Sequence, residues 1–88
     1  MPWRIRWEKR ALKDMAAFSP RDRERISRYL LERIADRDDP RDVGAALVGP
    51  QSGYWKYRVG DYRIIASIMD TEVTVIVVRV GNRREVYR

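Results

Sequence analysis

Residues 54–69 constrain the fold of this chain more than any other stretch, because they read as a β-hairpin closed by a tight turn. Aromatic and β-branched residues run up to Gly60-Asp61 and away from it again. Glycine at the first position of a two-residue loop favours a type II′ turn, and the alternation of side chains then fixes the strand register. The predicted cross-strand pairs are Val59 with Tyr62, Arg58 with Arg63, Tyr57 with Ile64, Lys56 with Ile65, and Trp55 with Ala66.

This register divides the hairpin into a basic face and an apolar face. Lys56, Arg58 and Arg63 gather on the basic face near the turn, whereas the apolar face carries Trp55, Tyr57, Val59, Tyr62, Ile64, Ala66 and Ile68. Like charges directly opposite one another destabilise a strand pair by roughly 0.2–1 kcal/mol, so a bound anion would explain the cluster. Two alternatives stay open: long side chains splayed into water, or a one-residue slip that moves the cations to the other face.

Arginine dominates the charge of the chain. Its 88 residues include 19 Lys and Arg against 13 Asp and Glu, for a net charge of +6, and lysine occurs only at positions 9, 13 and 56. Because guanidinium groups bind phosphate in a bidentate manner and stack on bases, this balance favours a nucleic-acid partner, with acidic proteins as the alternative. The length predicts a single domain over residues 1–88.

The residue types that are missing narrow the possible chemistry. The chain has no cysteine and no histidine, which excludes disulfides, thiolate chemistry and histidine-activated nucleophiles. Any acid–base catalysis must use Lys, Arg, Tyr, Asp or Glu. We expect neither a cofactor nor a metal. The opening residues Met-Pro-Trp-Arg-Ile-Arg-Trp-Glu contain no apolar leader, and no later segment reaches membrane-spanning length, so the predicted location is the cytoplasm.

The segments before the hairpin predict one strand and two helices. Residues 3–7 alternate apolar and basic side chains, as a half-buried strand does, with Trp3, Ile5 and Trp7 inward. The following helix should bury Ala11, Leu12, Met15 and Phe18. Ser19-Pro20 with Asp22 predicts the start of a second helix, whose inward residues are Ile26, Tyr29, Leu30 and Ile34. Its outer face mixes both charge signs, which favours a solvated surface over contact with an RNA backbone.

The remaining segments complete the predicted architecture. Residues 36–53 read as a loop in which Ala46, Leu47 and Val48 tuck into the core. Residues 73–78 are apolar on both faces, which indicates a central strand, and Gly81-Asn82 is expected to turn the chain after it. The predicted fold class is α+β in the order β-α-α-β-β-β, a small and mostly antiparallel sheet with two N-terminal helices packed on one face.

The C-terminal segment carries a second group of basic and aromatic residues. Arg83, Arg84 and Tyr87 follow the predicted turn, and such residues can bind a phosphate and stack a base. Solvated arginines and a tyrosine packed on an edge strand remain the alternative reading.

Nearly the whole chain resembles the small toxins of the RelE/ParE superfamily from bacterial and archaeal toxin–antitoxin pairs. The resemblance is carried by Arg10-Ala11-Leu12-Lys13, by Leu47-Val48-Gly49, by the hairpin core Arg58-Val59-Gly60-Asp61-Tyr62-Arg63, and by Val80-Gly81-Asn82-Arg83 running to Val86-Tyr87. These motifs occur in the order and at the separations typical of the superfamily. The resemblance implies a RelE-like, microbial-RNase-like fold.

The superfamily has two functional branches, and the resemblance favours one of them. RelE-type members are ribosome-dependent endonucleases that cut mRNA in the decoding site, whereas ParE-type members poison DNA gyrase and generally lack the basic catalytic set. By motif match, that set corresponds here to Lys56, Arg58, Arg63, Arg83 and Tyr87. Relatives often carry lysine where Arg58 stands, and arginine does not realistically give up its proton. Many relatives also continue into a further helix, so the placement of Tyr87 is expected to depend on a partner.

The resemblance also implies a mechanism and partners. The RNA 2′-hydroxyl would attack the adjacent phosphate without a metal and give a 2′,3′-cyclic phosphate and a 5′-hydroxyl end. Lys56, crowded by cations, is the candidate general base, and the other four residues would clamp the phosphate, stabilise the leaving oxygen and orient the base. The implied partners are a cognate antitoxin, the ribosome with its mRNA, and operator DNA bound through the antitoxin. The alternatives are a ParE-like gyrase inhibitor and an inactive member that binds RNA or antitoxin.

Overall fold

The computed structural model describes residues 2–82, so the predictions made for Arg83 and Tyr87 lie outside the described residues. A π-helical segment, Leu30–Ala35, continues the second helix directly. The principal elements in chain order are β1 (Arg4–Trp7), α1 (Lys9–Ala16), α2 (Pro20–Tyr29), β2 (Ala45–Ala46), β3 (Trp55–Val59), β4 (Tyr62–Met69) and β5 (Thr74–Asn82).

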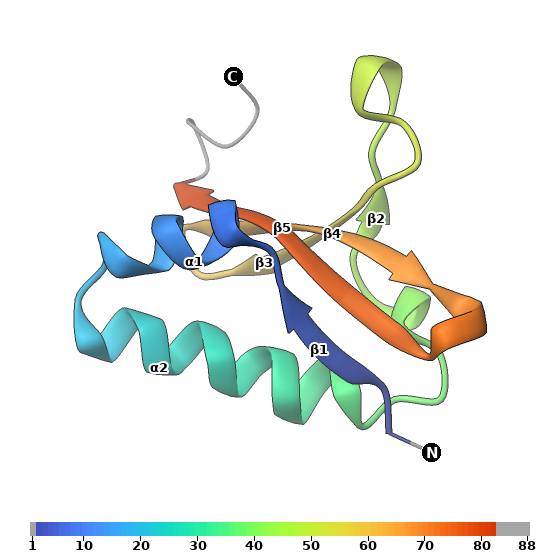
Figure 1. Ribbon diagram of the computed structural model, residues 1–88, viewed down its shortest axis with the longest axis horizontal. Coiled ribbons are helices and arrows are strands. Elements are labelled where there is room, and N and C mark those ends of the chain that lie inside the picture. Colours follow the sequence, from blue (N-terminus) through green and yellow to red (C-terminus); the bar gives the residue numbers. More distant parts are fainter. Residues whose placement is uncertain (1, 83–88) are drawn as a thin grey trace.

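The strands form one mixed sheet in the spatial order β1-β5-β4-β3-β2. The β2–β3, β3–β4 and β4–β5 pairs are antiparallel, and only β1 pairs in parallel, with β5. Figure 1 shows α2 running along one side of the sheet, while the connection between β2 and β3 projects away from it. This arrangement confirms the predicted α+β class, the mostly antiparallel sheet and the interior position of the strand that begins near residue 73.

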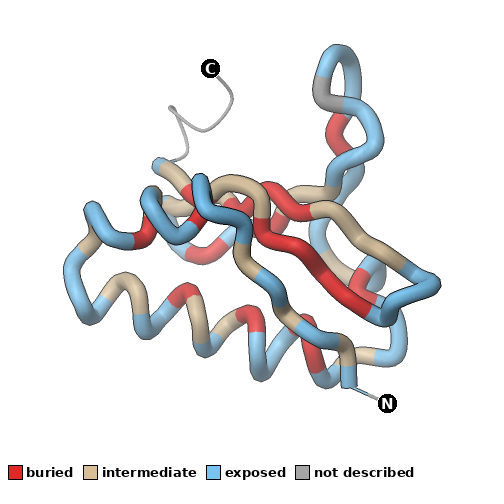
Figure 2. Tube along the Cα trace, viewed as in Figure 1, coloured by how far each residue is buried: buried red, intermediate tan, exposed pale blue. Residues whose placement is uncertain are grey.

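One hydrophobic core joins both helices to the sheet. Ile26, Leu30 and Ile34 are fully buried and share this core with Ala11 and Met15 of α1 and with Tyr57, Val59, Ile64, Ala66, Val75, Val77 and Val80 of the sheet. Figure 2 shows the buried residues along β5 and on the side of α2 that faces the sheet. The helical spacing of the apolar residues therefore predicted the inward face of α2 and its continuation correctly.

Several residues differ from their predicted environment. Leu12 is 55% exposed rather than buried, because the buried face of α1 is narrow and consists of Ala11 and Met15. Of the three loop residues expected in the core, only Leu47 is buried, where it packs against Ile65, whereas Val48 is 84% exposed. Ala46 is also exposed, and it belongs to β2, a strand within the segment predicted as loop.

The start of α2 has the predicted cap. The Ser19 hydroxyl accepts a hydrogen bond from the Asp22 backbone N–H at 3.2 Å, and Pro20 occupies the first helical position, where its missing N–H is not needed. The Asp22 carboxylate in turn accepts a hydrogen bond from the Tyr62 hydroxyl at 2.8 Å. The helix start is thereby tied to the first residue of β4.

Asp14 of α1 completes the free edge of β5. β1 pairs with β5 only as far as Val77, so within residues 2–82 the later part of β5 has no strand on that side. There the Asp14 Oδ2 atom accepts hydrogen bonds from the Val80 backbone N–H at 3.0 Å and from the Arg79 Nε atom at 2.9 Å. Gly81 and Asn82 continue β5 opposite Arg63 and Tyr62, so the turn predicted at these residues is wrong.

We expect Asp14→Ala to destabilise the protein by about 1–3 kcal/mol, since it leaves the partly buried Val80 N–H without its acceptor. Asp14→Asn keeps an oxygen at this position and should lose clearly less stability. Urea unfolding followed by circular dichroism measures both values. Equal losses in the two variants would show that the carboxylate charge, rather than the edge hydrogen bond, supplies the stabilisation.

Candidate functional site

The hairpin of β3 and β4 has the register predicted from its sequence. Val59 pairs with Tyr62 and Arg58 with Arg63, leaving only Gly60 and Asp61 in the turn. Gly60 has a φ of 58°, and Asp61 has no positive φ, which is the type II′ combination. Tyr57 and Val59 are buried on the helix side, so Arg58 and Arg63 lie on the opposite face of the sheet.

Lys56, Arg58 and Arg63 line a common pocket of about 150 Å³. Gly44, Ala45 and Tyr57 complete its wall. The structure thus brings together three of the five residues singled out in the sequence. Arg58 and Arg63 are direct cross-strand neighbours, an unfavourable placement for two cations in the absence of an anion.

The guanidinium group of Arg63 has an unused hydrogen-bond donor. Within residues 2–82, its Nη1 atom is the buried side-chain nitrogen or oxygen that lacks any hydrogen-bond partner. Burying a donor without an acceptor costs roughly 1–3 kcal/mol, and more for a charged group. Arg58 is exposed at the pocket and donates from its Nε atom to the Gly60 carbonyl at 3.3 Å. A phosphate oxygen in this pocket would satisfy the Arg63 donor and offset the repulsion between the two arginines.

The wall of the pocket opposite the hairpin turn is built by the segment before β3. Ala45 of β2 pairs with Lys56, and the Trp55 indole donates a hydrogen bond to the Val43 carbonyl at 2.7 Å. Gly44, between Val43 and Ala45, has a φ of 80°, and a Cβ atom added there would lie 2.3 Å from the Lys56 carbonyl oxygen. Only glycine allows the chain to approach β3 this closely. This wall was not predicted from the sequence, although Gly44, shortly before the hairpin, was a visible signal.

Tyrosines behind the basic pocket are held in their neutral form. Burial raises the pKa of Tyr57, whose hydroxyl donates to the Pro40 carbonyl at 2.6 Å. The hydrogen bond to the Asp22 carboxylate raises the pKa of Tyr62. Both hydroxyls therefore act as structural donors at neutral pH. Within the described part of the chain, no group of three or more Asp or Glu side chains is placed to hold a metal ion.

Three cations line one pocket on a sheet backed by two helices, an arrangement suited to an anion, in a protein of the α+β class. The family described as "ParE toxin of type II toxin-antitoxin system, parDE" matches residues 5–87. The chain is 28% identical to Toxin RelG of Mycobacterium tuberculosis, over all of this chain and 99% of that relative.

Solved structures of similar proteins also include toxins of toxin–antitoxin systems. The toxin–antitoxin complex RelBE2 from Mycobacterium tuberculosis contains a chain with a TM-score of 0.86 and 26% identity, covering 97% of this chain and 95% of that one. The isolated RelE toxin of E. coli matches with a TM-score of 0.70 and 25% identity, covering 97% and 90% of the two chains. The protein therefore belongs to the ParE toxin family of type II toxin–antitoxin systems, within the RelE/ParE superfamily that its motifs resemble.

Proposed function

We propose that this toxin is a RelE-type endoribonuclease that cleaves mRNA in the decoding site of the ribosome and so inhibits translation. The observation that carries the proposal is the pocket shared by Lys56, Arg58 and Arg63, with the unpartnered Arg63 Nη1 atom. A phosphodiester supplies an acceptor oxygen for the Arg63 donor and negative charge opposite the neighbouring Arg58 and Arg63. The similarity to Toxin RelG and to the RelE toxin of E. coli supports the same branch.

In the proposed reaction, the RNA supplies the nucleophile and the protein supplies position and charge. The 2′-oxygen forms a bond to the adjacent phosphorus, and the bond from phosphorus to the 5′-oxygen breaks. Arg58 and Arg63 clamp the phosphate, and Lys56 is the candidate base that takes the 2′ proton. Arg83 is proposed to stabilise the leaving oxygen and Tyr87 to orient the base. The leaving 5′-oxygen takes a proton from water, and the products are a 2′,3′-cyclic phosphate and a 5′-hydroxyl end.

We also propose which partners the toxin binds and where in the cell it acts. Relatives crystallised as toxin–antitoxin complexes support a cognate antitoxin for this chain, which would neutralise it by covering the basic pocket. That complex would bind operator DNA through the antitoxin. Ribosomal RNA offers a large polyanion to a protein of charge +6, so the site of action would be the cytoplasm. None of the helices in residues 2–82 has the length and apolar character needed to cross a membrane.

Primer extension on a defined mRNA tests this function. Purified toxin is incubated with the mRNA alone and with ribosomes whose decoding site is empty. We expect discrete cuts at the decoding-site codon only when ribosomes are present. A folded, toxic protein that gives no cuts in either reaction would contradict the proposal.

The family name provides a reason to keep one alternative, a ParE-like inhibitor of DNA gyrase. Such a toxin would leave mRNA intact and block supercoiling by purified gyrase. The supercoiling assay is therefore the companion experiment, and inhibition there without mRNA cleavage would replace the nuclease proposal.

A further inference from the structure

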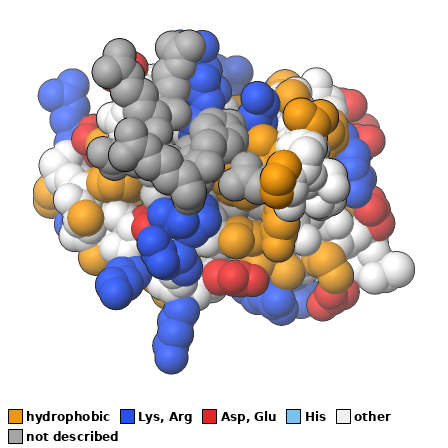
Figure 3. Space-filling view, turned by 90° about the horizontal axis from the view of Figure 1, so that it is seen from above, with side chains coloured by type: hydrophobic (Ala, Val, Ile, Leu, Met, Phe, Trp, Pro, Cys, Tyr) orange, Lys and Arg blue, Asp and Glu red, His pale blue; other side chains and the backbone are white. Residues whose placement is uncertain are grey.

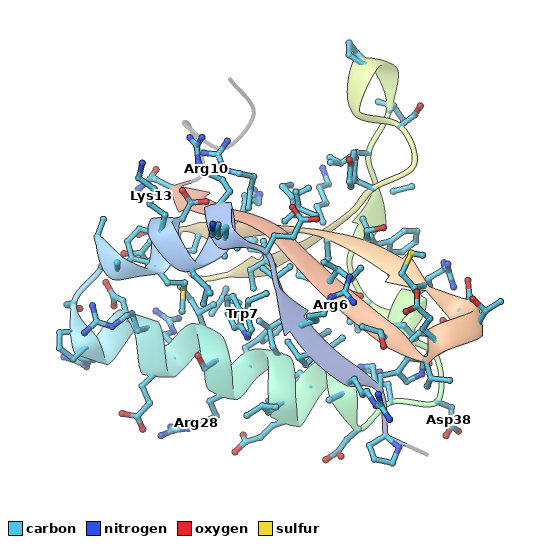
Figure 4. The ribbon with its side chains drawn as sticks, viewed as in Figure 1. Arg6, Trp7, Arg10, Lys13, Arg28 and Asp38 are labelled. Carbon is cyan, nitrogen blue, oxygen red and sulfur yellow. The ribbon has the colours of Figure 1, made fainter. Side chains whose placement is uncertain are left out.

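A second and larger pocket of about 560 Å³ lies between α1 and the last residues of β5. Arg10 and Lys13 stand on its α1 side, and Figure 4 shows both projecting from the same side of that helix, away from α2. Phe18 and Tyr62 also line the pocket, with ring centroids 4.7 Å apart. None of these four residues has a role in the proposed cleavage step. Figure 3 views the side toward which Arg10 and Lys13 project and shows Lys and Arg side chains gathered there.

The cations of this pocket are not balanced by its acid. Asp14 is engaged at Oδ2 by the Val80 N–H and the Arg79 Nε atom. Arg10 approaches the other oxygen only to 3.5 Å, and its side chain is 60% exposed. Within residues 2–82, Lys13 has no ion-pair or hydrogen-bond partner. Arg10 and Lys13, one helical turn apart, therefore carry positive charge at the pocket that Asp14 does not fully neutralise.

This pocket adjoins the one that holds Lys56, Arg58 and Arg63. Arg63 lines the smaller pocket and pairs directly with Gly81 of β5, which lines the larger one. Paired strands lie only about 4.8 Å apart. Gly81 has no side chain that could separate the two pockets at this position. A basic path consequently crosses the sheet from β3 through β4 and β5 to α1.

We propose that the pocket between α1 and β5 is a second RNA site, which holds the single strand that flanks the phosphate bound at Arg63. Arg10 and Lys13 would each contact a backbone phosphate, and the Phe18–Tyr62 pair, at the helix-side wall of the pocket, offers aromatic surface to a base. Cations that follow the backbone together with aromatic rings are how proteins hold single strands without reading their sequence. The inference rests on the proposed nuclease function and adds to it the length of RNA that the protein holds.

Binding of uncleavable RNA tests this site separately from cleavage. A trinucleotide and a nonanucleotide, both with 2′-O-methyl groups, are titrated against wild type, the double variant Arg10→Ala/Lys13→Ala and the control Arg28→Ala/Arg33→Ala. The control removes the same charge from the outer side of α2 and its continuation, where Figure 4 shows Arg28 pointing away from α1. All four side chains are exposed, and circular dichroism checks that both variants fold.

We expect the Arg10/Lys13 variant to bind the nonanucleotide roughly 10- to 30-fold more weakly at about 0.1 M salt, with a salt slope smaller by about 1.4, as two lost phosphate contacts require. Its affinity for the trinucleotide should match that of the control. An equal loss in the control would overturn the proposal, as would a nonanucleotide that binds wild type no more tightly than the trinucleotide.

A further arm uses ribosomes that carry no mRNA. If the Arg10→Ala/Lys13→Ala variant lost affinity only for these ribosomes and not for the nonanucleotide, Arg10 and Lys13 would be assigned to ribosomal RNA. That result would overturn the single-strand site. Failure of the nuclease proposal can be told apart from failure of the second RNA site. In the first case mRNA is not cleaved, but the uncleavable nonanucleotide still binds more tightly than the trinucleotide.

Discussion

Arg63→Ala is expected to reduce ribosome-dependent mRNA cleavage by at least about 10²- to 10³-fold, as removal of one preorganised donor to a developing charge commonly does. Arg63 is chosen because its side chain lines the pocket and its Nη1 atom, within residues 2–82, is buried without a hydrogen-bond partner. Folding should be unharmed, since the variant removes a cross-strand repulsion with Arg58. Primer extension on programmed ribosomes measures the rate, and urea unfolding measures the stability.

Two companion variants sharpen this experiment. Arg63→Lys keeps the charge but loses the planar fork, so it should recover only part of the activity. Arg28→Ala removes an arginine whose exposed ion pair with Glu24 lies on α2, and it should cleave as wild type does. A fully active Arg63→Ala protein would remove Arg63 from the catalytic set and leave the pocket as a binding surface.

The second large effect is expected at Gly44. Gly44→Ala places a Cβ atom 2.3 Å from the Lys56 carbonyl oxygen and also adopts a φ of 80°, which a side chain disfavours. The backbone conflict at β3 cannot be relieved by rotating a side chain. We expect a loss of about 2–5 kcal/mol in the free energy of unfolding, the sum of the strained φ and the overpacking. Urea unfolding at neutral pH measures it.

Gly49→Ala is the matched control for this variant. Gly49 has a similar φ of 73°, but an added Cβ would meet nothing within 4 Å. It should lose only about 1–2 kcal/mol, the cost of the backbone conformation alone. Because the Gly44 segment forms the wall beside Lys56, a folded Gly44→Ala protein should also cleave more slowly, whereas Gly49→Ala should not. Equal stability of the two variants would mean that β2 moves away from β3 without consequence.

The hairpin was predictable because its determinants are local. The alternation of residues 55–59 and 62–66 and the glycine in the turn select one register, and no distant contact is needed to choose it. The start of α2 was predictable for the same reason, since Ser19 and Asp22 are three residues apart. The basic cluster of Lys56, Arg58 and Arg63 followed directly from that register.

The features that the sequence concealed depend on contacts between distant segments. β2 has only two alanines and exists because Gly44 lets that segment approach β3. Gly81 and Asn82 resemble a turn, yet β4 continues beside them and holds them in β5. Leu12 has a helical spacing that suits burial, but the core accepts only the neighbouring Ala11 and Met15. The second pocket was likewise hidden, because Arg10 and Lys13 meet the end of β5 only in the folded chain.

The parallel pairing of β1 with β5 has a consequence for the order in which this protein folds. Within residues 2–82, the first strand pairs only with β5, in a register that joins Arg4 to Thr74 and Trp7 to Val77. Residues 4–7 therefore cannot take their place in the sheet until a segment about 70 residues later in the sequence is present to pair with them. Pairing across such a long separation is slow, so β1 is expected to join the sheet late in folding.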